Sequence, residues 1–89
     1  MTDLLVYLVR VHVRFFAALR ETVGKPYLQL DLPEGATPED VWRRVSADHP
    51  GLAGRRPSLS AAVNRRYSGF DAVLGEGDEV VFVPPVSGG

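Results

Sequence analysis

The sequence contains no cysteine, and this absence excludes several classes of protein. Without a thiol, the chain cannot form a disulfide, hold an iron–sulfur cluster through thiolates or act as a thiol nucleophile. A persulfide carrier and a ferredoxin are both excluded, since a ferredoxin needs cluster cysteines. Any sulfur chemistry must therefore use another group of the chain, and packing alone must hold the fold together.

An excess of positive charge is also missing. Ten basic and eleven acidic residues give a formal net charge of −1, whereas proteins that bind nucleic acid non-specifically need an excess of lysine and arginine facing the phosphates. We therefore expect no nucleic acid as a main partner. The two histidines, His12 and His49, have no second ligand at metal-binding spacing, so we expect neither a bound metal nor a bound cofactor.

Long apolar runs are absent as well. The run that begins at Leu4 ends at Arg10 and is far shorter than the roughly 20 residues of a membrane span. Asp3 precedes this run, where a signal peptide would carry basic residues. We expect a cytoplasmic protein with no membrane partner, in which residues 1–8 form an N-terminal extension.

Residues 9–83 have the pattern of a single α+β domain. Four segments have the composition and period of strands, and the last is apolar on both sides, which predicts a central strand covered on both faces. Thr37 and Pro38 begin the main helix as N-cap and first helical residue, and Gly24 ends a shorter helix. This order predicts a mixed sheet packed against one main helix. The predicted strands are 9–15, 27–32, 59–64 and 79–83, the short helix is 17–23, the main helix ends at 49–51, and residues 67–74 form a short segment without a strand.

The chain ends in a narrow tail, residues 84–89, directly after the last predicted strand. Pro84 and Pro85 cannot donate ladder hydrogen bonds and must leave the sheet. Gly88 and Gly89 lack Cβ atoms and can enter a tight channel, so the tail presents its carboxylate on a slim, flexible tip. A carboxylate is inert until another enzyme activates it, for example by adenylation. Because flexible or truncated tails end in the same way, two glycines alone are a weak signal.

Three blocks of the sequence resemble the small subunits of molybdopterin synthase, the MoaD type. They are FFAALRETVG at 15–24, AVN at 62–64 and GDEVVFVPPVSGG at 77–89. The resemblance covers roughly residues 9–89, and its last block is the most specific, since few carriers ending in Gly-Gly have Gly-Asp-Glu-Val and Pro-Pro-Val-Ser ahead of it. It implies a ubiquitin-like β-grasp fold, in agreement with the predicted element order.

The resemblance also implies a sulfur-carrier chemistry. An E1-like enzyme would adenylate the Gly89 carboxylate with ATP and magnesium, and a sulfurtransferase would convert it to a thiocarboxylate. The large synthase subunit, in a heterotetramer, would then take the tail into its active site and pass the sulfur to cyclic pyranopterin monophosphate, which builds the dithiolene of molybdopterin. This chain would be the sulfur-donating subunit, with the catalytic pocket on its partner. By this resemblance the catalytic residues are Gly88 and Gly89, and the tail residues that bind the partner are Pro84, Pro85, Val86 and Ser87.

The family's apolar partner contact falls on Phe16, Tyr67 and Val83 by the same resemblance. Tyr67 departs from the aliphatic residue expected at its position. The competing interpretation is that all three side chains are ordinary members of the core.

Two other functions stay open. The tail would serve equally well if the sulfur acceptor were a thiamin precursor or a tRNA base, or if the carboxylate were conjugated to a protein lysine, as in a ubiquitin-like modifier. A β-grasp binding module without any terminal chemistry is the second alternative. Only the sequence blocks ahead of the tail favour the pterin pathway over these alternative functions.

Overall fold

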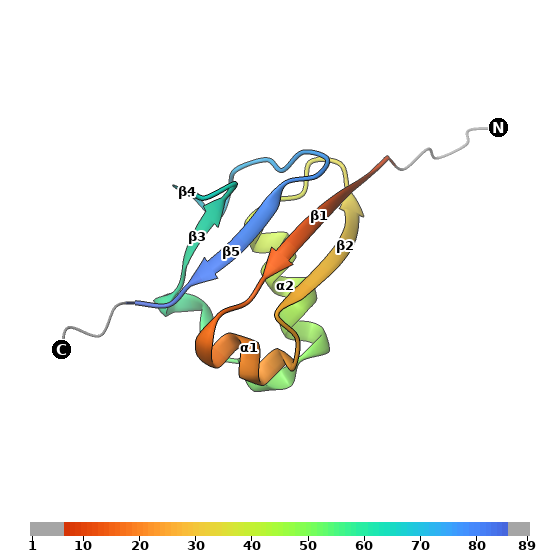
Figure 1. Ribbon diagram of the computed structural model, residues 1–89. Helices are drawn as coiled ribbons and strands as arrows, with labels where there is room; N and C mark the ends of the chain where they lie inside the picture. Colours follow the sequence, from red (N-terminus) through yellow and green to blue (C-terminus); the bar gives the residue numbers. More distant parts are fainter. Residues whose placement is uncertain (1–6, 86–89) are drawn as a thin grey trace.

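The structure is a computed structural model that describes residues 7–85. Five strands form one mixed sheet in the order β2-β1-β5-β3-β4. β1 and β5 run parallel, and the other neighbouring strands run antiparallel (Figure 1). The strands are β1 (Leu8–Arg14), β2 (Tyr27–Pro33), β3 (Ser60–Val63), β4 (Arg66–Ser68) and β5 (Glu79–Val83). The predicted mixed sheet is therefore confirmed.

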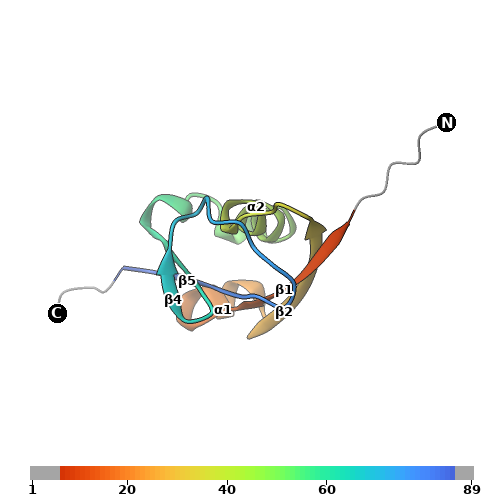
Figure 2. The ribbon, with the colours of Figure 1, turned by 90° about the horizontal axis from the view of Figure 1, so that it is seen from above.

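Two α-helices, α1 (Ala17–Val23) and α2 (Pro38–Asp48), accompany the sheet. α2 covers one face of the sheet, whereas α1 lies at the end of the sheet where β1 finishes (Figures 1 and 2). Two short 3₁₀ turns, η1 (Pro50–Leu52) and η2 (Arg56–Ser58), lead from α2 toward β3. Within residues 7–85, neither α-helix has the length and hydropathy needed to cross a membrane.

The ends of both α-helices follow from local chemistry. Thr37 and Asp40 form a reciprocal capping box at the start of α2: the Asp40 N–H donates to Thr37 Oγ1 at 3.3 Å and the Thr37 N–H donates to Asp40 Oδ2 at 2.9 Å. Gly24 ends α1 in the left-handed conformation, with φ of 82°. The predicted helix start at residue 38 and the stop after residue 23 are both confirmed.

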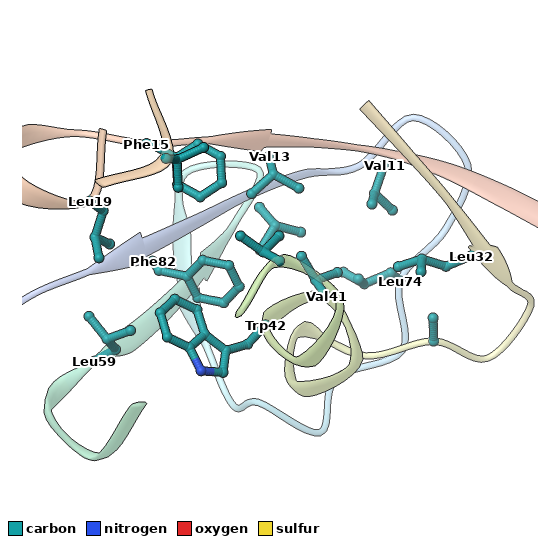
Figure 3. Close-up of a cluster of buried hydrophobic side chains, with 14 of the residues drawn as sticks. Val11, Val13, Phe15, Leu19, Leu32, Val41, Trp42, Leu59, Leu74 and Phe82 are labelled. Carbon is teal, nitrogen blue, oxygen red and sulfur yellow. The ribbon is translucent and has the colours of Figure 1, made fainter. Parts of the chain in front are cut away.

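The hydrophobic core lies between α2 and the sheet. The Trp42 ring meets the Phe82 ring edge to face (Figure 3), with 5.1 Å between the ring centroids. Phe70 stacks on Phe82 with 6.0 Å between the ring centroids. Phe15 is also buried although it lies just outside β1. Its N–H donates to the Pro26 carbonyl at 3.0 Å in the register of the β1–β2 ladder, but Pro26 has no N–H to return the bond, so the strand ends at Arg14. The first strand is therefore Leu8–Arg14 rather than the predicted 9–15.

Two expectations about the C-terminal half are wrong. β4 begins at Arg66 and continues into the segment 67–74, which was predicted to have no strand. Its three residues are too few to show an alternation, and the strand depends on pairing with β3. β5 is the middle strand, as predicted, but only one of its faces is covered. Val80 and Phe82 are fully buried under α2, whereas Val81 and Val83 on the opposite face are only half-buried.

The turn between β3 and β4 consists of two residues in the left-handed conformation, Asn64 with φ of 51° and Arg65 with φ of 69°. Two consecutive positive φ angles are typical of a type I′ hairpin turn, which favours Asn at the first position and Gly at the second. The Asn64 side chain accepts from the Glu79 N–H and donates to Asp78 Oδ1, both at 2.9 Å. The hydrogen bonds of Asn64 therefore join the turn to the start of β5. The left-handed conformation of Arg65 is sterically unfavourable for a residue with a Cβ atom, and no described hydrogen bond of its side chain offsets it.

We expect glycine at these two neighbouring positions to have opposite effects on stability. Arg65→Gly should raise the free energy of unfolding by about 1 kcal/mol, because glycine removes the Cβ clash of the left-handed conformation, and the only described ion pair lost is a long one to Glu79. Asn64→Gly should lower it by about 1 kcal/mol, because two hydrogen bonds are lost. Urea unfolding measures both values, and a gain from both variants would show that the Asn64 hydrogen bonds contribute nothing.

Candidate docking face and C-terminal tail

The root of the C-terminal tail is held by the best-anchored strand of the fold. β5 pairs with β1 on one side and with β3 on the other, and the side chains of Val80 and Phe82 are fully buried. Pro84 and Pro85 follow directly and are both exposed. The predicted tail residues Val86, Ser87, Gly88 and Gly89 lie outside the described residues. The structure thus shows where the tail leaves the domain.

The face of the sheet opposite α2, here called the outer face, is formed by alternate residues of the five strands. Strand register defines one continuous row across this face, since each member pairs with the next. From β4 to β2, the row consists of Tyr67, Ala62, Val81, Arg14 and Tyr27.

Phe16 and Val83 lie at the end of the outer face from which the tail departs. Phe15 is buried in the core and Phe16, the next residue in extended backbone, is 52% exposed, so the two rings point to opposite sides. Val83 lies on the same side of β5 as Val81. Arg14 and Val81 are the last pair of the parallel ladder, so Phe16 and Val83 each follow two residues beyond that pair, at the same end of the sheet.

The three residues predicted to form the apolar partner contact therefore share one face. Tyr67 lies on the edge strand β4 and is 76% exposed, so the core interpretation is wrong for Tyr67 and for Phe16. Val83 is half-buried. We call this surface the docking face and define it as Phe16, Ala62, Tyr67, Val81 and Val83. Sequence reasoning missed Ala62 and Val81. Strand alternation leads from Val83 to Val81, and the pairing of β4 with β3 leads from Tyr67 to Ala62.

Charged groups occupy the middle and the far end of the outer face. The Arg14 Nε lies 3.0 Å from Glu79 Oε2, and Arg65 Nε lies 3.9 Å from Glu79 Oε1. Farther from the docking face, the Arg10 Nε donates to Asp31 Oδ1 at 2.9 Å. This hydrogen bond lowers the pKa of the Asp31 carboxyl and raises the pKa of the Arg10 guanidinium. The outer face is thus apolar where the tail leaves and charged beyond.

The described residues include no cluster suited to metal binding. Between residues 7 and 85, no group of three or more His, Cys, Asp or Glu side chains could hold a metal ion. His12 Nδ1 instead shares a hydrogen bond of 2.7 Å with the Tyr27 hydroxyl, and the two rings stack. The ring nitrogen of His12 is thus engaged within the sheet by a neighbouring strand.

Comparison with known proteins identifies the family. The ThiS family profile matches residues 13–89. The molybdopterin synthase sulfur carrier subunit of Escherichia coli is 41% identical and is aligned over 89% of this chain and 99% of its own length. The small archaeal modifier protein 3 of Haloferax volcanii is 35% identical over 91% of this chain and 100% of its own length.

Solved structures agree with this assignment. A molybdopterin converting factor subunit 1 from Pyrococcus furiosus superimposes with a TM-score of 0.79 at 31% identity, covering 88% of this chain and 99% of that one. The fold also matches a chain in the complex of subunits 1 and 2 of the molybdopterin-converting factor from Helicobacter pylori, with a TM-score of 0.65 at 22% identity and coverage of 91% and 100%. The chain has the ubiquitin-like β-grasp fold, is similar to molybdopterin synthase sulfur carrier subunits, and belongs to the ThiS family.

Proposed function

We propose that this chain is the sulfur carrier subunit of a molybdopterin synthase and that the carboxylate of Gly89 carries the sulfur. The observation that supports this most directly is the tail root: β5 is paired on both sides and passes straight into the exposed Pro84 and Pro85. A buried strand sets where the tail begins, and the glycines of its tip have no side chain to obstruct entry into an enzyme channel.

In this proposal the sulfur reaches Gly89 in two steps on other enzymes. On an E1-like enzyme with magnesium, a Gly89 carboxylate oxygen attacks the α-phosphorus of ATP, which forms an acyl adenylate and releases pyrophosphate. A sulfurtransferase then supplies a sulfur nucleophile that attacks the acyl carbon and displaces AMP, which leaves a thiocarboxylate. The absence of cysteine fits this route, since the sulfur is held on the chain terminus.

Sulfur donation takes place in the large synthase subunit, with which this chain forms a heterotetramer. The docking face binds that subunit through Phe16, Tyr67 and Val83, while residues 84–87 lead the tail into its active site. The thiocarboxylate sulfur is transferred to cyclic pyranopterin monophosphate, and two such transfers form the dithiolene of molybdopterin. The complex is the sulfurtransferase, and this chain contributes the donor group.

Intact-mass measurement tests the central step. After incubation with the activating enzyme, ATP, magnesium and a sulfur source, the protein should gain the mass that corresponds to exchange of one oxygen for sulfur. Fragmentation should place the gain on the peptide that contains Gly89. Omission of ATP should leave the mass unchanged, and a gain located elsewhere in the chain would contradict the proposal.

A second candidate, conjugation of Gly89 to a protein lysine, is favoured by the similarity to the small archaeal modifier protein 3. Gene deletion separates the acceptors. Loss of molybdenum-cofactor enzymes with normal thiamin synthesis and normal tRNA thiolation is expected for the synthase subunit. Normal molybdoenzyme activity with loss of a thiolated tRNA base or of protein conjugates would contradict the pterin assignment and leave the role of Gly89 intact.

A further inference from the structure

Arg14 lies at the centre of the outer face, where the apolar docking face meets the charged region. It pairs with Val81 on one side and with Tyr27 on the other, and its side chain is 52% exposed. The sulfur chemistry proposed above makes no use of it. The ion pair with Glu79 at 3.0 Å holds the guanidinium on this face and leaves about half of the side chain open to a partner.

Charge is unbalanced around Arg14. Among residues 7–85, Glu79 is the carboxylate within ion-pair distance of both Arg14 and Arg65, so in this part of the chain two guanidinium groups share one carboxylate and one positive charge is left over. The other acidic groups nearby, Glu76 and Asp78, lie in the turn before β5, at the end of the strand away from the tail. There the Glu76 carboxylate accepts from the Arg10 N–H, and the Asp78 carboxylate accepts from the Gly75 N–H and the Asn64 amide. The border of the docking face is therefore positive.

We propose that Arg14 is a binding residue at the rim of the docking face and that it pairs with a carboxylate of the large synthase subunit. This inference rests on the proposed function, which supplies the partner. An apolar centre with a polar, charged rim is the usual anatomy of a protein interface, and arginine is enriched in such surfaces. A guanidinium has five N–H donors, so it can keep its contact with Glu79 and still bind a second carboxylate.

The test compares charge reversal on the two sides of the domain. Arg14→Glu should weaken binding of the complete chain to the large subunit by at least about fivefold at low salt, because a repulsive pair replaces an attractive one. Arg44→Glu is the matched control. Arg44 lies on α2, on the other side of the sheet, its side chain is 54% exposed, and it is paired with Asp48 at 3.8 Å. The affinity of the Arg44→Glu variant for the large subunit should stay within about twofold of the wild type.

Salt dependence separates a charge contact from damage to the fold. Titrations at low and high sodium chloride should show that the loss in Arg14→Glu shrinks as salt rises, because screening weakens an exposed ion pair. Arg14→Gln keeps most of the stem and removes the charge. It should lose less affinity than Arg14→Glu, and its binding should depend less on salt than that of the wild type. This variant keeps the test valid even if Arg14→Glu folds poorly. Thermal melting of each free variant verifies the fold.

Each outcome has a distinct meaning. If both Arg14 variants bind as tightly as the wild type, or if Arg44→Glu causes the same loss as Arg14→Glu, the inference is wrong while the proposed function stands. If the wild-type chain does not bind the large subunit at all, the proposed function fails and the inference with it. Sedimentation of the free protein detects self-association. If Arg14→Glu changes self-association but not binding to the large subunit, the inference is also wrong.

Discussion

Gly88→Val is expected to reduce sulfur loading of the tail, or its transfer to the pterin, by at least about 100-fold, while the domain stays as stable as the wild type. Under the proposed function, valine adds a branched side chain to a segment that would pass through a narrow channel, and a small misplacement of a reacting group can cost about that factor. Residue 88 lies beyond the last described position, Pro85. Thiocarboxylate formation and pterin conversion are measured separately in single-turnover assays, beside a thermal melt.

The comparison variant is Gly88→Ala, which adds one methyl group at the same position. A channel limited by side-chain size should tolerate alanine better than valine, so its activity should fall between that of Gly88→Val and that of the wild type. Equal activity of all three proteins, with equal melting temperatures, would show that no narrow channel limits the reaction. Loss of stability in Gly88→Val would show instead that the tail packs on the domain.

The parts of the fold that sequence reasoning predicted well are those fixed by neighbouring residues. Alternation in β1 and the Thr37 cap of α2 are local signals, because a strand face repeats every two residues and a cap needs only a side chain three positions away. The left-handed Gly24 is likewise local. β4 was missed because its three residues are held by pairing with β3 through a two-residue turn rather than by a pattern of their own.

The candidate site was less predictable for the same reason. A resemblance to a family pointed to Phe16, Tyr67 and Val83, but whether these side chains were core or surface depended on which face α2 covers. Arg14 drew no attention in the sequence, since its position beside Val81 depends on the parallel pairing of the first and last strands. Contacts between segments so distant in the chain follow from packing of the whole core, which no local pattern encodes.

Tyr67→Ala is expected to weaken binding of the large subunit by at least tenfold and to leave the free energy of unfolding nearly unchanged. Tyr67 is 76% exposed on the edge strand, so its ring contributes little to the core. Aromatic residues at an interface centre often cost about 2 kcal/mol or more when truncated. Calorimetric titration with the large subunit gives the affinity, and urea unfolding of the free variant gives the stability.

Phe82→Ala provides the opposite case in the same sheet. Phe82 is fully buried and its ring packs on Trp42 and Phe70, so its truncation should lower the free energy of unfolding by about 3–5 kcal/mol. That is a large share of the stability of a small domain, and any loss of affinity should follow the folded fraction. Tyr67→Ala should instead lose affinity with all of the protein folded. If Tyr67→Ala destabilises the domain as Phe82→Ala does, Tyr67 contributes to the core in solution and the docking face must be drawn without it.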